Sequence, residues 1–303
     1  MKRANTEESS FSENASPLPS TKGREGGASP NRSRQVELRR VPGVELLADR
    51  ALISYLKIIV EINRSKKSLY YRNEPRLTAH GTEEFKIRMG FGLHAGWAIE
   101  GAVGSTHKID ATYLSPHVNM AARLETSSRQ YGVPILVSEI FYDLLSSEVK
   151  ETMRKIDVIT VKGSEVPIGI YTYDSDQEKK FVDKLTRRQS NLIVNKGGRL
   201  PPKLMTIMDD TIEIFQKDPD LLYLREHVNE KFLNIFKQGL EKYLEGKWKE
   251  SKQFLDQSNE MMKTMSPSFI NGDGPSLTLL EYMEERNWEA PADWKGFRPL
   301  TSK

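Results

Sequence analysis

The sequence of 303 residues contains no cysteine, only five histidines and no long hydrophobic run. The lack of cysteine excludes disulfide scaffolds, cysteine-ligated zinc and a thiol nucleophile. The histidines are scattered and do not show the spacing of metal ligands. The longest apolar stretch, around Leu52–Ile62, is interrupted by Lys57 and Glu61 and falls short of the ~20 apolar residues of a membrane helix. With no signal segment at the start, we expect a soluble, cytoplasmic protein without a membrane segment.

The net charge of +3 is small and unevenly placed. It comes entirely from residues 1–40, which hold eight Lys and Arg against five Asp and Glu. No basic stripe with interleaved aromatic residues occurs elsewhere, so nucleic acid is not an expected partner. Residues 1–41 are also rich in Ser, Pro, Gly and Asn and nearly lack large apolar side chains, which predicts a disordered leader.

The middle of the chain alternates between helical and extended patterns. Apolar residues at offsets of three and four predict an amphipathic helix over Val44–Leu69. Further helices are expected over Val118–Tyr131 and Ile140–Leu145, and strands over Phe85–Leu93, Ala98–Val103, Pro134–Val137, Ile156–Val161 and Ile168–Tyr173. Residues 42–175 are therefore predicted to form a mixed α+β unit.

The last third of the chain has a different character. A polar, basic stretch at 176–203 predicts a linker, and residues 204–303 predict a helical C-terminal extension. Its expected helices cover Leu204–Gln216, Leu221–Leu244 and Trp248–Met262. The last two, separated at Gly246, resemble a tetratricopeptide-like hairpin, although no second copy follows.

Two sequence blocks carry the most specific pattern in the chain. The first is IRMGFGLHAGWAIEGAVGSTHKIDATYLSPHVNMAARLE (87–125), and the second is VKGSEVPIGIYTY (161–173). In this order they resemble the second half of the catalytic domain of class III nucleotidyl cyclases, the adenylyl and guanylyl cyclase family. The residues in register with the family pattern are Arg88, Gly90, Gly92, His94, Gly96, Gly101, Gly104, Val118, Asn119, Ala121, Arg123 and Glu125. The C-terminal extension resembles one that follows some bacterial and protist cyclase domains.

The resemblance implies a set of site residues. In the family, the residue matching Asn119 orients the ribose and the one matching Arg123 stabilises the transition state, so these are the expected catalytic residues. Lys162 matches a lysine that holds the terminal phosphates, and Thr112 matches a position that contacts the purine. Threonine there favours ATP, with GTP as the alternative.

Each of these residues also has a simpler interpretation. Asn119 and Arg123, four residues apart, could be an ordinary solvated helix face, and Lys162 a solvated turn residue. Thr112 would then be a plain strand residue, and His94 would pack or cap a turn.

The resemblance covers roughly residues 50–175, so the first third of the family domain has no counterpart. The two aspartates that hold Mg²⁺ or Mn²⁺ in the family belong to that third, and no metal ligand is expected in this chain. We therefore expect an incomplete ferredoxin-like cyclase domain, in which the strand around Met89–Leu93 lacks neighbours and invites pairing with another chain. Pro116 replaces part of the family's turn and could alter the start of the next helix.

Three functional hypotheses follow. In the first, the chain contributes one half of a dimeric active site, and a homologous cyclase domain that carries the metal ions completes it. The reaction would convert ATP to cyclic AMP and pyrophosphate. In the second, the chain is a catalytically inactive interaction or regulatory protein derived from a cyclase. In the third, it is a truncated gene product.

Overall fold

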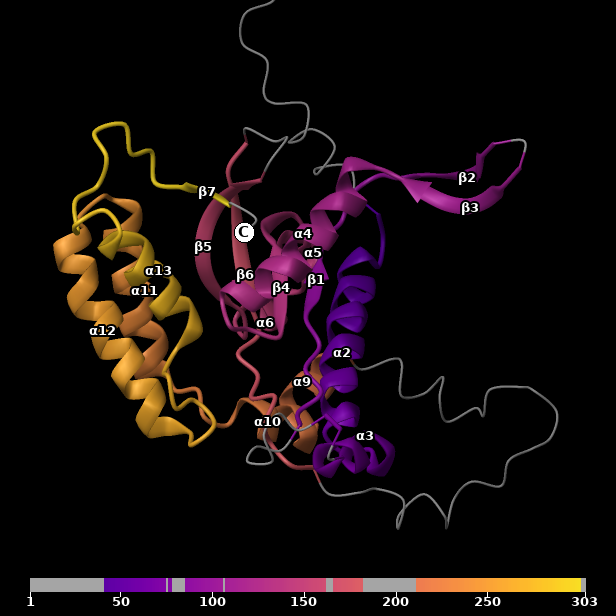
Figure 1. The fold of residues 1–303 in the computed structure, drawn as a ribbon, viewed down its shortest axis with the longest axis horizontal. Helices are drawn as coiled ribbons and strands as arrows, with labels where there is room; N and C mark the ends of the chain where they lie inside the picture. The colour runs from indigo at the N-terminus through magenta and orange to yellow at the C-terminus, as the bar shows by residue number, and fades with distance from the viewer. Residues whose placement is uncertain are drawn as a thin grey trace, which may run out of the picture.

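A five-stranded sheet lies at the centre of the molecule, with helices on both sides (Figure 1). This computed structural model describes residues 41–74, 76–77, 85–105, 107–161, 166–181 and 211–300. The predicted leader and most of the predicted linker at 176–203 lie outside these ranges. The strands are β1 (Phe91–Leu93), β2 (Ile99–Gly104), β3 (Ile109–Leu114), β4 (Ile135–Ser138), β5 (Arg154–Val161), β6 (Ile168–Thr172) and β7 (Arg298–Leu300).

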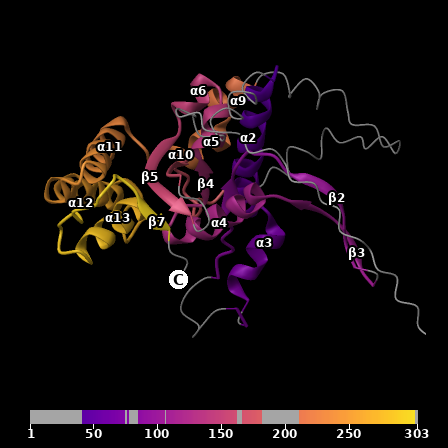
Figure 2. The same cartoon turned by 90° about the horizontal axis from the view of Figure 1, so that it is seen from above.

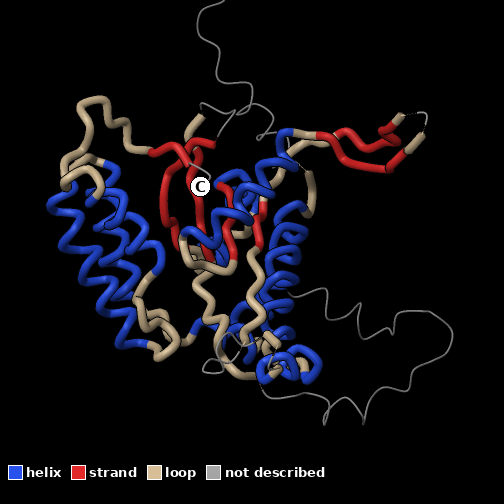
Figure 3. Tube along the Cα trace, in the orientation of Figure 1, coloured by secondary structure: helices blue, strands red, loops and turns tan. Residues whose placement is uncertain are grey.

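The helices divide between the two halves of the chain. The first half has α2 (Val44–Ile62), α3 (Lys66–Tyr70), the 3₁₀ turn η1 (Tyr71–Asn73), α4 (Pro116–Gln130), α5 (Glu139–Leu144) and α6 (Ser147–Lys150). The second half has α9 (Thr211–Lys217), α10 (Pro219–Arg225), α11 (Glu230–Leu244), α12 (Trp248–Met265) and α13 (Gly274–Glu284). Figure 3 shows this succession of segments, and the expected α+β fold with a helical C-terminal region is confirmed.

The strand order of the sheet is β1-β4-β6-β5-β7. β1 pairs with β4 in parallel, and β4, β6 and β5 pair antiparallel. The expectation that the strand near Met89–Leu93 lacks neighbours was therefore wrong, because Phe91 lies opposite Ile135 and Leu93 opposite Val137. Only Phe91–Leu93 of the predicted strand Phe85–Leu93 is extended in the sheet.

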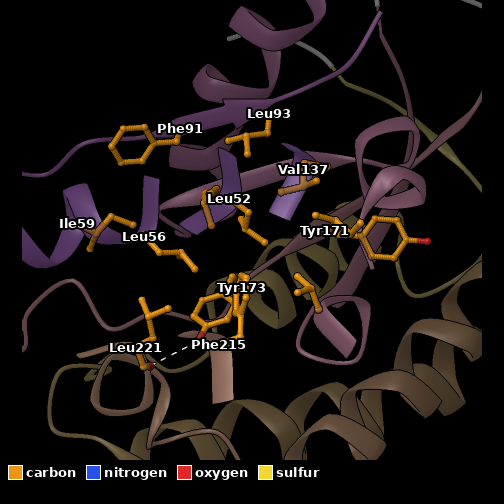
Figure 4. Close-up of a cluster of buried hydrophobic side chains, with 14 of the residues drawn as sticks. Leu52, Leu56, Ile59, Phe91, Leu93, Val137, Tyr171, Tyr173, Phe215 and Leu221 are labelled. Atoms are coloured by element: carbon orange, nitrogen blue, oxygen red, sulfur yellow. Dashed lines mark hydrogen bonds between the residues drawn. The ribbon is translucent and has the colours of Figure 1, made fainter. Parts of the chain in front are cut away.

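The first hydrophobic core lies between α2 and the β1 side of the sheet. Leu52, Leu56 and Ile59 are buried from α2 because they recur on one helical face. Figure 4 shows these side chains among Phe91 and Leu93 from β1, Tyr173 after β6, and Phe215 and Leu221 from the second half of the chain. The helical region after residue 211 thus contributes to the hydrophobic core of the α+β unit formed by residues 42–175.

A second core joins α4 and β5 to the C-terminal helices. Leu124 and Ile156 are buried in the same cluster as Phe236, Tyr243 and Trp248. Four side chains of α11 are buried on the face that meets this core, namely Phe232, Phe236, Leu240 and Tyr243.

The predicted helix Leu221–Leu244 is interrupted. α10 ends at Arg225, and α11 begins only after Asn229, whose side chain accepts a hydrogen bond from the Phe232 nitrogen. Asparagine is a favoured N-cap, so it starts a new helix here. α11 and α12 then form a helical hairpin, with Gly246 in a left-handed conformation (φ 80°) at the bend.

Candidate functional site

Asn119 and Arg123 lie on α4, one turn apart and therefore on one face of the helix. The Asn119 side chain is exposed and the Arg123 side chain is half-buried. Within the part of the chain that the structure describes, neither side chain has a hydrogen-bond or ion-pair partner. Their donor groups are therefore available to a ligand.

The start of α4 is well formed despite the departure from the family's turn. Pro116 occupies the first helical position, where its lack of an N–H costs nothing. The Ser115 hydroxyl accepts a hydrogen bond from the His117 nitrogen at 3.0 Å and donates one to the Trp97 carbonyl at 2.5 Å. The proline thus begins the helix that carries the two predicted catalytic residues.

β1 holds the middle of α4 by a close backbone approach. A Cβ atom on Gly92 would overlap the Ala121 carbonyl oxygen and the Glu125 nitrogen, and it would lie 2.9 Å from the Leu124 Cβ. Only glycine permits this contact. Leu124 is fully buried beneath the helix, which fixes the rotation of α4 about its axis and so the direction of the neighbouring Arg123.

The C-terminal helices hold the other end of α4. The Thr278 hydroxyl donates a hydrogen bond to the Gln130 carbonyl at 3.0 Å. Tyr131 donates to Asp157 at 2.6 Å and accepts from Arg298 at 2.9 Å, all within the buried core. The helix with the Asn–Arg pair is therefore supported by β1 at its middle and by α13 and β7 at its end.

A histidine pair lies at the start of α4. His94 Nε2 is 2.8 Å from His117 Nδ1, and His94 Nδ1 is 2.8 Å from the Ser138 hydroxyl. Burial, with a smaller contribution from His117, lowers the pKa of His94 to about 4. The neutral ring therefore joins the end of β1 to β4 and α4, in agreement with the packing role expected for His94. No sequence pattern indicated its pairing with His117.

Thr112 lies in the hairpin of β2 and β3, which projects from the body of the molecule in both views (Figures 1 and 2). It is opposite Gly101 and is half-buried. The described residues show no hydrogen bond from Thr112 to Asn119 or Arg123. The structure therefore unites two of the four predicted site residues on one helix and places the third on a separate projection.

Lys162, the fourth predicted site residue, lies outside the described residues. Among the residues described, there is no group of three or more His, Asp or Glu side chains that could hold a metal ion. The described residues thus offer no Mg²⁺ or Mn²⁺ site of their own. None of the helices in the described ranges combines the length and apolar character that crossing a bilayer requires.

Comparison with known proteins now identifies the central segment, since residues 53–175 match the family model of the adenylate and guanylate cyclase catalytic domain. These residues are a partial cyclase catalytic domain. We call residues 53–175 the cyclase segment. It contains Asn119, Arg123, Lys162 and Thr112.

Individual relatives are similar over the same part of the chain. An adenylate cyclase of Anabaena cylindrica is 39% identical over 87 residues, which are 28% of this chain and 17% of that protein. A terminal-differentiation specific adenylate cyclase of Dictyostelium discoideum is 31% identical over 33% of this chain and 5% of its own length. An adenylate cyclase of Rhizobium meliloti is 33% identical over 31% of this chain and 13% of its own length.

Solved structures of a bacterial light-regulated adenylyl cyclase also align, at 28% identity. The alignment covers 48% of this chain and 38% of that one, with a TM-score of 0.32. The chain therefore spans only a small part of the curated relatives and well under half of this structure.

Proposed function

We propose that the cyclase segment supplies the phosphate-binding half of a shared cyclase site that converts ATP to cyclic AMP and pyrophosphate. The observation that supports this most is the Asn119–Arg123 pair, which is partnerless among the described residues on a helix held at its middle and its end. A rigidly placed guanidinium is suited to phosphoryl oxygens because its planar donors match their geometry.

The proposed reaction needs stabilisation of charge on phosphate. The ribose 3′ oxygen attacks the α-phosphorus as its proton is lost, and the bond from that phosphorus to the β-phosphate oxygen breaks to release pyrophosphate. Negative charge grows on the phosphoryl oxygens, where a preorganised cation lowers the barrier most. In this proposal Arg123 supplies that cation, Asn119 orients the ribose, Lys162 binds the terminal phosphates and Thr112 contacts the purine.

The divalent ions are proposed to come from a partner. The family pattern calls for Mg²⁺ or Mn²⁺, which would polarise the phosphates and activate the attacking oxygen. Because the described residues form no metal cluster, we assign the metal-binding carboxylates to a homologous cyclase domain in a heterodimer. Of a homo- or heterodimer, only the heterodimer can bring carboxylates that the described part of this chain does not offer. ATP is a cytoplasmic metabolite, so we also propose that the protein acts in the cytoplasm.

The β2–β3 hairpin is the surface that best suits such a partner. Ile99, Val103 and Leu114 are 64%, 43% and 51% exposed, and the strand register places them on the face that also carries Thr112. Ile109 and Tyr113, on the other face, are 71% and 58% exposed. A projection that exposes large apolar side chains on both faces is typical of a segment that inserts into another subunit.

The test is complementation of an inactivated cyclase. The full chain is mixed with a complete cyclase catalytic domain that keeps its metal aspartates but has lost its own Asn–Arg pair, with ATP and Mn²⁺ present. Cyclic AMP should form only in the mixture, and Arg123→Ala should abolish the gain. Arg129→Ala is the matched control, because Arg129 lies on the same helix and, among the described residues, forms its ion pair with Glu125.

The inactive interaction protein is the second candidate, favoured by the lack of a metal cluster among the described residues. It predicts a stable complex with the cyclase domain and no cyclic AMP, with or without Arg123. A cyclic AMP signal from the purified chain alone would contradict both candidates. An upstream coding region with metal-binding aspartates would instead show that the chain is part of a longer product.

A further inference from the structure

A cavity of about 260 Å³ lies away from α4, where segments from both halves of the chain meet. Its walls come from the end of α2, from η1, from the residues that precede β1, from the loop that follows β6 and from the loop that follows α12. The lining residues are Asn63, Arg72, Lys86, Ile87, Arg88, Gln177, Glu178, Lys180, Pro267 and Ser268. No residue of α4 lines it, so it is separate from the proposed cyclase site.

The side chains that line this cavity carry an excess of positive charge. Four of its lining side chains are cationic and only one, Glu178, is a carboxylate. Lys86 and Arg88 each place a nitrogen 2.6 Å from a different oxygen of Glu178. Although partial burial acts to raise it, hydrogen bonds from Lys86 and Arg88 hold the pKa of Glu178 below its usual range. Two further cations, Arg72 and Lys180, have no carboxylate partner among the described residues.

The cavity walls are fastened to one another by polar contacts. Arg72 donates to the buried Asn63 side chain at 3.3 Å, and its carbonyl accepts from the Phe85 nitrogen at 2.9 Å. Asp176 accepts from the Glu178 nitrogen at 2.9 Å and from the Ser266 hydroxyl at 3.1 Å. Contacts between distant segments therefore set the positions of the cations before any ligand arrives, which reduces the cost of binding.

We propose that this cavity binds a phosphate-bearing small molecule. Two arginines supply planar donors for phosphate oxygens, and the two lysines add positive charge. Asn63, Gln177 and Ser268 add neutral hydrogen-bonding groups, and Ile87 and Pro267 provide apolar surface for the rest of the ligand. The volume is larger than inorganic phosphate requires and sits just below the ~300 Å³ at the lower end of small-molecule pockets.

In this proposal the Glu178 carboxylate competes with the ligand. Its carboxylate occupies Lys86 and Arg88, so an incoming phosphate must compete with it for the same donors. Removing the charge of Glu178 should therefore strengthen binding. A purely structural role for Glu178 makes the opposite prediction, because its loss would loosen the two cations and weaken any binding.

The experiment is titration calorimetry of the full chain with pyrophosphate, in an Arg123→Ala, Lys162→Gln background so that the proposed cyclase site does not contribute. We expect one saturable site, at least tenfold weaker binding in Arg72→Gln and in Lys86→Gln, and severalfold tighter binding in Glu178→Gln. The matched control is Lys249→Gln, which removes a cation whose exposed partner is Glu289 and should leave binding unchanged. Circular dichroism verifies that each variant is folded, and the exposed Lys86 gives a second variant should Arg72→Gln unfold.

Several outcomes would overturn the proposal. These are the absence of saturable binding, equal weakening in Lys249→Gln, and weaker binding in Glu178→Gln. A parallel titration with inorganic phosphate and with citrate separates phosphate recognition from general anion binding. Binding of citrate that is tighter than that of pyrophosphate would reject the phosphate assignment.

Discussion

Arg154 in β5 and Asp273 at the start of α13 form a buried two-fold contact, with nitrogen–oxygen distances of 2.8 and 3.1 Å. On its other side the same guanidinium contacts Asp174 at 2.6 Å. Its plane also lies over the rings of Phe232 and Phe236 from α11, at 4.9 and 4.3 Å. A single arginine of the cyclase segment thus ties two helices of the C-terminal region to the sheet.

The Arg154–Asp273 contact predicts the effect of Asp273→Asn. The asparagine keeps an oxygen that can accept from the Ser276 nitrogen at the N-cap, so the substitution removes mainly the charge. We expect the free energy of unfolding in urea to fall by roughly 1.5–3 kcal/mol, the worth of hydrogen bonds to a charged group. Asp256→Asn is the control. It breaks an exposed pair with Lys252 and should cost less than about 1 kcal/mol. Equal losses of unfolding free energy in Asp273→Asn and Asp256→Asn would show that burial of the Arg154–Asp273 pair adds nothing to stability.

The close approach of β1 to α4 predicts that Gly92→Ala displaces the helix that carries Arg123. The added methyl meets backbone atoms of Ala121 and Glu125, which cannot rotate away. We expect a loss of about 1–3 kcal/mol in unfolding free energy and a reduced gain of cyclic AMP in the complementation assay. Gly101→Ala, in the β2–β3 hairpin, has nothing within 4 Å of the added methyl and should leave stability unchanged or slightly higher. Full complementation by Gly92→Ala would show that the position of α4 is unimportant.

The half-buried His94 predicts a loss of stability in acid. Its pKa is about 4 in the folded protein, below the ordinary value of 6.5, so the unfolded state takes up the proton first. The stability that the neutral ring contributes is therefore present above about pH 6.5 and is lost as the pH falls toward 4. We expect wild type to lose roughly 3 kcal/mol more than His94→Asn over this interval in urea titrations.

The control for this measurement is His107→Asn, because His107 is exposed in the β2–β3 turn. The unfolding free energy of His107→Asn should fall with decreasing pH as much as that of wild type. Buried His227, whose pKa is also lowered chiefly by burial, is present in both proteins and cancels from the comparison. If the unfolding free energies of wild type and His94→Asn fall in parallel as the pH is lowered, His94 is not the source of the acid sensitivity.

The exposed hairpin predicts where a partner binds. The double variant Ile99→Asp, Leu114→Asp places two charges at a directly opposed pair of strand positions. We expect its association with the complete cyclase domain, measured by sedimentation velocity, to be at least about tenfold weaker than that of wild type. Ile270→Asp changes a loop residue that is 82% exposed elsewhere and should have no effect. Loss of association in both variants, or in neither, would exclude the hairpin as the contact.

The local elements of the cyclase segment could be predicted from the sequence, whereas the sheet partners could not. α4 and the strands β5 and β6 follow from local periodicity and from the motif around Asn119 and Arg123. The pairing of β1 with β4 joins residues more than forty positions apart, and no local pattern specifies it. β7 is only Arg298–Leu300 and contains a proline, so it carries too little alternation to indicate a strand.

The candidate site likewise combines local features that the sequence predicts with tertiary arrangements that it does not. The spacing of Asn119 and Arg123 is a local property of a helix and was correctly placed on one face. The distance of Thr112 from that face depends on how far the hairpin projects, and the cavity near Arg72 depends on five separate segments meeting. Such arrangements arise from tertiary packing rather than from neighbouring residues in the chain.

The parallel contact of β7 with β5 has a consequence for protein synthesis. A ribosome makes β5 more than 130 residues before it reaches Arg298, so this side of the nascent sheet remains unpaired while those residues are made. The Asp157 carboxylate likewise lacks its ion-pair partner until Arg298 has been made. In the folded chain the Arg298 guanidinium lies 2.8 Å from this carboxylate. Pairing of the sheet is therefore completed only after residues 298–300 have been made, and until then β5 presents an open edge that can pair with another chain.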